Sequence, residues 1–406
     1  MDYSQSIAFL ERLPQPKSWR LERMRKLVKK AGINFEGLKF IHITGSNGKG
    51  STAAMLYSIL RQDGKSVALY SSPHLTDWRE RFLLNGKIIS EKKFADLAGR
   101  VKKAALETKA SQFEVLTAMA LAWFEVEKPD WVVWEAGLGG RLDATNVVDA
   151  RYAVLTPISL EHTEKLGKTI SKIAWEKSKI IKRNSTAITP NDGIALREIE
   201  KECKRQNAKL VKVSKPPKVS CRNDGTEFEF QGRKWKTKLL GFHQAVNAST
   251  AITVAKEMGI GEKIIERGLL KAHWPGRMQV FSKKPLVVLD GAHNPAGVEA
   301  LCHSFSRIFG LKPVLVVGIM KDKEWEKMAG IFSSALKPSL VIATQPKNER
   351  SLNARVLAKE FEKRGYKTFV EKNVRKAVET AMLKAVEGKK TVLVAGSLYL
   401  IGEVLA

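Results

Sequence analysis

The chain has little cysteine and no long apolar run. Its 406 residues include only Cys203, Cys221 and Cys302, which are widely spaced and form no Cys-x-x-Cys pair. Such spacing argues against both a zinc site and a disulfide framework. No apolar stretch approaches the roughly 20 residues that a membrane-spanning helix needs, and the first twenty residues lack the pattern of a secretory signal. We therefore expect a cytoplasmic protein with no membrane partner.

Acidic residues are scarce relative to basic ones. The chain holds 70 lysine and arginine residues against 42 aspartate and glutamate residues, a formal net charge of +28 at pH 7. This balance admits nucleic acid, an anionic membrane or acidic small molecules as partners. The lysines are scattered through nearly every expected helix and are not interleaved with aromatic residues. Without a recognised binding module, basic charge is weak evidence for nucleic-acid binding, so we expect small anionic substrates and no nucleic acid.

Apolar runs of strand length alternate with helical periodicity along most of the chain. The first series of runs lies at 38–43, 66–75, 130–137, 152–159 and 185–190. A second series lies at 286–290, 313–318, 339–344, 367–370 and 391–395. Strands that alternate with helices predict parallel sheets with right-handed crossovers.

The two series imply two domains, because 406 residues are too many for one ordinary core. A segment with proline, glycine and lysine at 276–284 marks the expected boundary, which gives domains at 1–280 and 281–406. Between about 209 and 240, prolines, an Asn-Asp-Gly turn and alternating residues predict a small antiparallel insertion. We expect a ligand site between the domains, at the carboxyl ends of the strands.

The stretch TGSNGKGST follows the first expected strand and enters a helix. Glycines at a helix N-terminus let backbone N–H groups and the helix dipole face an anion. Two residues separate Gly45 from Gly48, and Gly50 separates Lys49 from Ser51, so the spacing differs from the common phosphate loop. The pattern favours phosphate binding, with Lys49 on the outer phosphates, over a glycine-rich turn without a ligand.

A second polar cluster follows the strand expected at 130–137. Glu135 ends that strand, and a carboxylate beside bound phosphates suits Mg²⁺, which prefers hard oxygen ligands. By itself, a glutamate at a strand end has a structural role about as often as it binds a metal ion. The residues that follow form a dense polar group: Arg141, Asp143 and Asn146. Taken alone, His162 would be a hydrogen-bonded loop residue and Lys177 a solvated helix residue.

Eight motifs occur in one order along the chain: TGSNGKGST, SSPHL, EAGLGGRLDATN, EHT with the later EKSKIIK, HQAVNA, WPGRMQ, LDGAHNPAG and AGSLYLIGEV. In order and spacing they resemble the folylpolyglutamate synthase and dihydrofolate synthase branch of the Mur ligase family. The resemblance runs from near residue 5 to the last residues. It implies an α/β fold in which a phosphate-loop ATPase domain, with a parallel sheet and a small antiparallel insertion, precedes a smaller Rossmann-like α/β domain.

The resemblance also implies a set of site residues. The ATP-binding positions are Gly45, Ser46, Asn47, Gly48, Lys49, Gly50, Ser51, Asn247, Arg277, Asp290 and His293. The metal ligands are Ser72, Glu135 and His162, and Lys177 matches a lysine that is carbamylated to N6-carboxylysine in the family. A carbamate could help to hold a second cation. The acceptor-binding positions are Ser111, Gln112, Phe113, Leu142, Asp143 and Ala144, and the residues expected to act in catalysis are Lys49, His162, Lys177 and Arg277.

Three departures from the family pattern accompany this resemblance. Glu161 stands where the family usually has aspartate, and Ser46 stands where threonine is commoner. EKSKIIK replaces the usual small residue and glycine after the lysine. These departures bear on the acceptor substrate and leave the ATP and metal positions intact.

The activity implied is that of an ATP-dependent acid–amino-acid ligase acting as a monomer. ATP would phosphorylate a folate or dihydropteroate carboxylate, and L-glutamate would then displace the phosphate, with two Mg²⁺ neutralising charge. Two alternatives stay open at this point. One is a Mur-family ligase that acts on a different carboxylate, and the other is a phosphate-loop ATPase that depends on nucleic acid.

Overall fold

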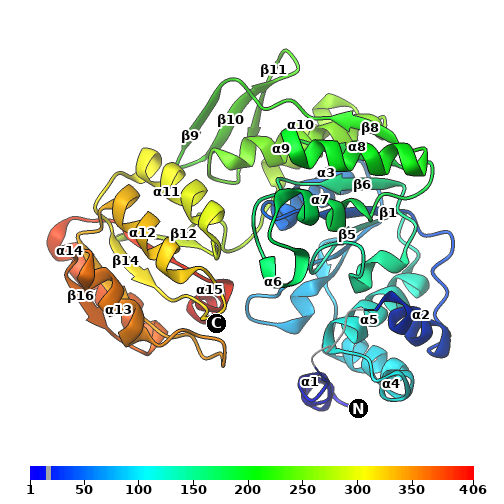
Figure 1. Ribbon diagram of the computed structural model, residues 1–406, viewed down its shortest axis with the longest axis horizontal. Coiled ribbons are helices and arrows are strands. Elements are labelled where there is room, and N and C mark those ends of the chain that lie inside the picture. The colour runs from blue at the N-terminus through cyan, green and yellow to red at the C-terminus, as the bar shows by residue number, and fades with distance from the viewer. Residues whose placement is uncertain (15–19) are drawn as a thin grey trace. The chain divides into compact units, whose positions relative to one another are not determined.

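The computed structural model describes residues 1–14 and 20–406, and this part of the chain divides into two compact units (Figure 1). Unit 1 comprises residues 1–215 and 247–272, and unit 2 comprises 216–246 and 273–406. The chain passes between the units three times, and the last of these crossings, at 272/273, falls just before the expected boundary segment. The segment 216–246 groups with unit 2, whereas we expected it with the first part of the chain. The division into domains at 1–280 and 281–406 stays a prediction about which parts fold independently.

Unit 1 is built on an eight-stranded sheet. In spatial order its strands are β4 (Lys87–Ile88), β3 (Phe82–Leu84), β2 (Val67–Tyr70), β5 (Trp131–Glu135), β1 (Phe40–Thr44), β6 (Tyr152–Leu155), β7 (Thr186–Thr189) and β8 (Lys209–Lys212). All neighbours from β2 to β8 are parallel, which confirms the predicted parallel sheet. The short antiparallel strands β3 and β4 were not predicted. The carboxyl ends of β2, β5, β1 and β6 therefore lie side by side.

Helices cover both faces of this sheet. Apolar residues of α1 (Tyr3–Glu11), α2 (Leu21–Lys30), α4 (Glu91–Thr108) and α5 (Gln112–Glu127) share one core with Phe40, Tyr70 and Trp134. The remaining helical segments of unit 1 are α3 (Lys49–Gln62), η1 (Trp78–Arg81), η2 (Ala144–Val147), α6 (Thr163–Leu166), α7 (Ile170–Ser178), α8 (Gly193–Gln206) and α10 (Glu262–Lys271), while α9 (His243–Glu257) crosses from unit 2. Every residue of β1 is buried, because a central parallel strand is covered on both faces. This burial explains the continuous apolar run in the sequence.

The segment expected to form an antiparallel insertion divides into a parallel part and an antiparallel part. Residues Lys209–Lys212 form β8, which pairs parallel with β7 at the edge of the unit 1 sheet. The expectation was wrong there, because parallel pairing depends on the crossover through α8 and not on the local residues. The rest of the segment is antiparallel as predicted, with strands β9 (Val219–Arg222), β10 (Gly225–Phe230) and β11 (Arg233–Thr237).

Unit 2 contains a second, six-stranded sheet in addition to that antiparallel sheet. Its order is β12 (Gln279–Lys283), β13 (Leu286–Asp290), β17 (Val392–Ala395), β14 (Val314–Val317), β15 (Leu340–Ala343) and β16 (Thr368–Val370). Its helices are α11 (Pro295–Phe309), α12 (Trp325–Leu336), α13 (Ala354–Lys363), α14 (Val374–Gly388) and α15 (Leu398–Leu405). The five strands from β13 to β16 are parallel, as predicted. Strand β12 is antiparallel and occupies the segment that we interpreted only as a boundary.

Among residues 1–14 and 20–406, none of the helices combines the length and the apolar character that a bilayer crossing requires.

Candidate functional site

The loop after β1 passes very close to its neighbours at two of its glycines. A Cβ on Gly45 would lie 1.8 Å from Oγ1 of Thr156, and a Cβ on Gly48 would lie 2.2 Å from Oδ1 of Asn247. Gly48 also has φ +88°, in the left-handed region. Helix α3 begins at the next residue, Lys49. The first N–H groups and the positive dipole end of α3 are therefore presented at this loop.

The first half of the loop is tied to the segment that follows β6. The N–H groups of Ser46 and Asn47 donate to the carbonyl of Pro157 over 2.9 and 3.2 Å. The Ser46 hydroxyl donates to the carbonyl of Ser159 over 3.0 Å and accepts from the N–H of Ser159 over 3.0 Å. Since these groups are bonded within the protein, the arrangement leaves anion binding to the N-terminus of α3.

Two lysines converge on one carbonyl oxygen of the loop. Nζ of Lys49 lies 2.8 Å from the oxygen of Gly45, and Nζ of Lys177 lies 2.9 Å from the same oxygen. Lys49 is the side chain expected to reach the outer phosphates. An incoming polyphosphate could draw Lys49 from Gly45 while Lys177 continues to hold the loop.

Lys177 is buried and is not the solvated helix residue that its position alone suggested. Its side chain is 1% exposed, and its ammonium lies 2.8 Å from the Glu161 carboxylate. Burial lowers the pKa of Lys177, against the attraction of Glu161. Burial would raise the pKa of Glu161, but the charges of Lys177 and Lys49 outweigh it and lower that pKa to about 2. The lowered pKa of Lys177 favours its neutral form, whereas the lowered pKa of Glu161 favours its charged form. The close contacts of the Lys177 nitrogen with Glu161 and Gly45 favour the charged lysine.

The contacts around Nζ of Lys177 suit an ammonium group. Both of its partners, the Glu161 carboxylate and the Gly45 carbonyl, are hydrogen-bond acceptors. A carbamate at this position would place a second anion beside Glu161, so Glu161 would have to turn away. The assignment of Lys177 as N6-carboxylysine stays a prediction that carries this requirement.

Two of the three expected metal ligands meet at the ends of β2 and β5. Glu135 is 3% exposed, lies opposite Ile43 of β1 and accepts a hydrogen bond of 3.2 Å from the N–H of Ser72. Carboxylate and hydroxyl oxygens are ligands that Mg²⁺ accepts. His162 directly follows Glu161, has φ +47° and is the N-cap residue that precedes the short helix α6. Among residues 1–14 and 20–406, no three His, Cys, Asp or Glu side chains are grouped to hold a metal.

The side chains expected to bind the acceptor are largely engaged in holding the protein together. Asp143 is 1% exposed and accepts hydrogen bonds from the N–H groups of Leu138 and Thr145 over 2.7 and 3.0 Å. Burial raises its pKa despite these bonds. Leu142 and Ala144 flank Asp143, and Ala144 begins η2.

The other expected acceptor residues lie at the start of α5. Both the N–H and the hydroxyl of Ser111 donate to Glu114 over 2.7 Å, and the Gln112 amide donates to the carbonyl of Leu10 over 3.1 Å. The Phe113 ring packs against Gly137, where an added Cβ would lie 2.5 Å from the ring. The Phe113 ring also lies 6.3 Å from the Tyr70 ring, measured between centroids.

Three expected ATP residues lie in unit 2 and surround Gly291. Asp290 ends β13 and accepts hydrogen bonds from the N–H groups of Met278 and Ala292 over 2.8 and 2.7 Å. A Cβ on Gly291 would lie 2.5 Å from Nη1 of Arg277, and Nδ1 of His293 lies 2.9 Å from the Gly291 carbonyl. Burial raises the pKa of Asp290, opposed by Arg277.

Some residues that shape the site were missed in the sequence. Thr156 and Pro157 hold the loop after β1, and the only sequence signal was their place directly after an expected strand. Glu161 was noted as a departure from the family pattern, but its pairing with Lys177 joins positions on different segments. Such long-range contacts leave no local signature.

Models of two protein families match the chain. The Mur ligase middle domain matches residues 43–255, and the Mur ligase glutamate ligase domain matches residues 276–398. A Halobacterium salinarum protein described as a probable bifunctional folylpolyglutamate synthase/dihydropteroate synthase is 37% identical over 91% of this chain and 47% of its own length. The chain thus spans about half the length of the haloarchaeal relatives it matches.

Other relatives match over most of their length. A Bacillus subtilis dihydrofolate synthase/folylpolyglutamate synthase is 35% identical over 76% of this chain and 77% of its own length. The solved structure of Mycobacterium tuberculosis folylpolyglutamate synthase complexed with ADP superposes with a TM-score of 0.91 at 28% identity, covering 98% of this chain and 96% of that one.

Proposed function

Because the chain belongs to the Mur ligase family, we propose that it is an ATP-dependent ligase that joins L-glutamate to a carboxyl group of folate or dihydropteroate. The observation that carries the proposal is the loop after β1. There, Gly45 and Gly48 bring the backbone against Thr156 and Asn247, and Lys49 stands at the start of α3. This arrangement is suited to a polyphosphate.

The proposed reaction has two steps. An oxygen of the acceptor carboxylate attacks the γ-phosphorus of ATP, the bond from that phosphorus to the bridging oxygen breaks, and ADP leaves. The amino group of L-glutamate loses one proton from its ammonium form, its nitrogen attacks the acyl phosphate carbon, and inorganic phosphate leaves. A second proton passes to solvent as the amide forms, and one hydrogen stays on the amide nitrogen. Lys49 and the α3 N-terminus would offset the charge of the transferring group. No covalent bond to the protein is required.

Ser72 and Glu135 would hold Mg²⁺, because they present a hydroxyl and a buried carboxylate at adjacent strand ends. The ion would supply neutralisation of phosphate charge. His162 is the third proposed ligand. We propose a second ion only if Lys177 is carbamylated, which requires Glu161 to leave its contact with Nζ.

Arg277, Asp290 and His293, which the fold of unit 2 gathers around Gly291, are proposed to contact the nucleotide. The Asp290 carboxylate would accept from a ribose hydroxyl, and Arg277 would face phosphate. Asn247 would contact adenine. The acyl phosphate must be kept from water, so exclusion of solvent from the bound substrates is part of the proposal.

The acceptor is the part of the proposal that the loop after β1 does not decide. Folylpolyglutamate synthase and dihydrofolate synthase both occur in the names of the relatives. The haloarchaeal relatives carry a dihydropteroate synthase name as well, and dihydropteroate is the acceptor of a dihydrofolate synthase. We therefore propose dihydropteroate as a second acceptor beside the folates. A monomer in the cytoplasm, where ATP is supplied, completes the proposal.

A phosphate-release assay tests this function. Purified protein is given ATP, Mg²⁺ and L-glutamate with dihydropteroate, dihydrofolate or tetrahydrofolate in turn. We expect phosphate release that requires both glutamate and one of these acceptors, and mass spectrometry should show one added glutamate. Release that responds to DNA or RNA instead, or to a different carboxylate only, would refute the proposal. Lys49→Met should abolish release, because it removes the charge facing the phosphates.

A further inference from the structure

The N-terminal helices α1 and α2 make polar contacts with two segments that hold expected site residues. One segment is the β2–β3 loop, residues 71–81, which contains Ser72. The other is the start of α5, residues Ser111–Phe113, called here the α5 platform. These contacts join parts of unit 1 that are far apart in the sequence, and nothing in the proposed reaction uses them.

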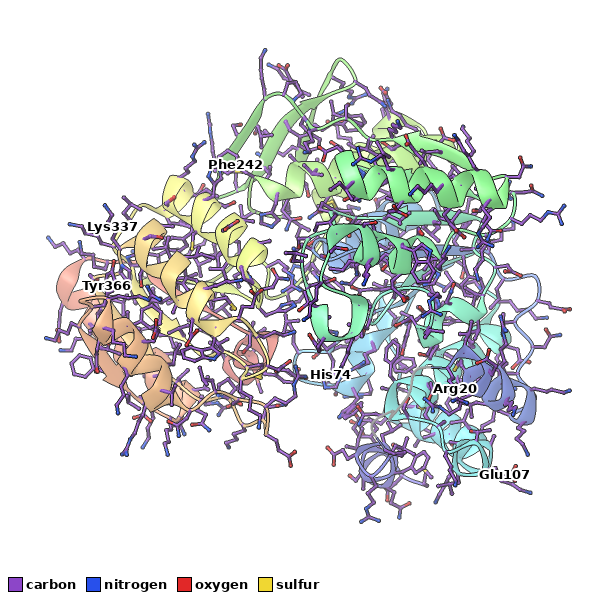
Figure 2. All side chains as sticks on the ribbon, in the orientation of Figure 1. Arg20, His74, Glu107, Phe242, Lys337 and Tyr366 are labelled. Carbon is purple, nitrogen blue, oxygen red and sulfur yellow. The ribbon has the colours of Figure 1, made fainter. Side chains whose placement is uncertain are left out.

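The β2–β3 loop is held in one shape by its own carboxylates. Glu80 accepts from the N–H groups of Leu75, Thr76 and Asp77 over 2.7, 3.0 and 2.9 Å. Ser71 donates its N–H to the carbonyl of Arg81 over 3.1 Å. His74, labelled in Figure 2, belongs to this loop, and its ring packs at a 47° tilt against Trp78 with 4.7 Å between ring centroids. These bonds fix residues 75–81 relative to one another, so an outside contact at Asp77 holds this part of the loop, while Ser72 keeps its own bond to Glu135.

Tyr3 supplies such an outside contact from the first residue of α1. Its hydroxyl donates to Oδ1 of Asp77 over 2.7 Å. The Arg79 guanidinium pairs with the same carboxylate over 2.6 Å and lies 5.1 Å from the Tyr3 ring. Tyr3 is also fixed from behind, because its ring packs edge-on against Phe94 of α4. The tyrosine therefore anchors the β2–β3 loop to the helical layer.

Arg23 of α2 makes the corresponding contact with the α5 platform. Its Nε lies 2.9 and 2.8 Å from the two carboxylate oxygens of Glu114. Glu114, only 7% exposed in its side chain, accepts both hydrogen bonds that fix Ser111. The carbonyl of Leu10, in the last turn of α1, accepts from Gln112. The α5 platform is thus held by residues of both N-terminal helices.

We propose that α1 and α2 act as a brace for acceptor binding, with Tyr3 and Arg23 as positioning residues that set the β2–β3 loop and the α5 platform. This inference rests on the proposed function, because it assigns the two segments to the acceptor side of that ligase. Neither residue needs to touch the substrate. Each acts through a carboxylate, Asp77 or Glu114, that orders backbone next to the site.

Steady-state kinetics of Tyr3→Phe and Arg23→Gln test the brace. We expect KM for the acceptor to rise three- to ten-fold, with kcat and KM for ATP within two-fold of wild type. Tyr3→Phe leaves Asp77 paired with Arg79, so this variant keeps its fold and decides the question if Arg23→Gln does not fold. Unchanged acceptor KM, or equal losses in all parameters, would overturn the proposal.

Two control variants make comparable changes at residues of unit 1 that do not contact the β2–β3 loop or the α5 platform. Tyr152→Phe removes a hydroxyl that donates to the Glu257 carbonyl over 3.2 Å. Lys30→Gln removes a charge from α2 itself, where Lys30 pairs with Glu107 over 2.6 Å (Glu107 is labelled in Figure 2). Both controls should leave the acceptor KM at the wild-type value. A rise of the same size in either control would overturn the proposal.

A second readout separates this inference from the proposed function. If wild-type protein uses none of the acceptors, the function fails, and amide hydrogen exchange then tests the brace alone. Tyr3→Phe should speed exchange in residues 75–80 and Arg23→Gln in residues 111–116, relative to the controls. Exchange that is unchanged, or faster throughout unit 1, would overturn it.

Discussion

Replacing Gly48 with alanine tests the close approach on which the nucleotide site depends. The new Cβ would lie 2.2 Å from Oδ1 of Asn247, well inside contact distance, at a residue with φ +88°. Gly64 provides a matched control, because it has φ +74° and an added Cβ there would meet nothing within 4 Å. The two variants share the backbone penalty and differ in the clash.

The expected magnitudes follow from these two terms. Left-handed backbone costs an alanine about 1–2 kcal/mol, and the loss of unfolded-state freedom returns about 0.4–1 kcal/mol. Gly64→Ala should therefore lower the free energy of unfolding by about 1 kcal/mol. Gly48→Ala should lose a further ~1–3 kcal/mol, the usual cost of overpacking a close-packed site.

Chemical denaturation measures the stability of both variants, and calorimetry measures ADP binding. Gly48→Ala should weaken ADP binding at least ten-fold, because the start of α3 must shift, whereas Gly64→Ala should bind as wild type does. In a double-mutant cycle, Asn247→Ala should recover most of the extra stability loss. Equal stability of the two glycine variants, with unchanged ADP affinity, would refute the close approach.

Three further predictions concern charge. Glu161→Gln should lower the free energy of unfolding by at most about 3 kcal/mol near pH 7 in Mg²⁺-free buffer, since the pKa of Glu161 falls from 4.5 to about 2. A carboxyl group with a lowered pKa stabilises the folded state at pH values above its pKa in the unfolded chain. The stability difference between wild type and Glu161→Gln should therefore shrink as the pH falls from 4.5 towards 2. A difference that stays constant over this range would contradict the pairing with Lys177. Asp290→Asn should cost about 1–2 kcal/mol, because both its oxygens accept N–H bonds and an amide can replace only one; an unchanged denaturation midpoint would count against this geometry. The net charge of +28 should attract anionic substrates, so KM for a polyglutamylated acceptor should rise with ionic strength, and a flat salt response would remove that role.

The local parts of the fold could be predicted because their signals lie within short windows. An apolar run in the sequence predicted strand β1, and the glycine-rich loop with Lys49 predicted the start of helix α3. The family motifs carried the remaining site positions, and the family assignment is confirmed by the matches to both Mur ligase domains. The roles of the individual site residues stay predictions.

Tertiary structure alone decided the contacts that give those residues their environment. From its position in the sequence, Lys177 is predicted to be a solvated helix residue, yet it is buried and contacts Glu161 and Gly45. The sequence predicts that Lys209–Lys212 belongs to an antiparallel insertion, yet this strand extends the parallel sheet. Residue type and spacing determine which backbone conformations are stable over a few residues. Which side chain faces a buried charge, and which strand lies beside another, depends on crossovers that bring distant segments together, and local periodicity carries no record of them.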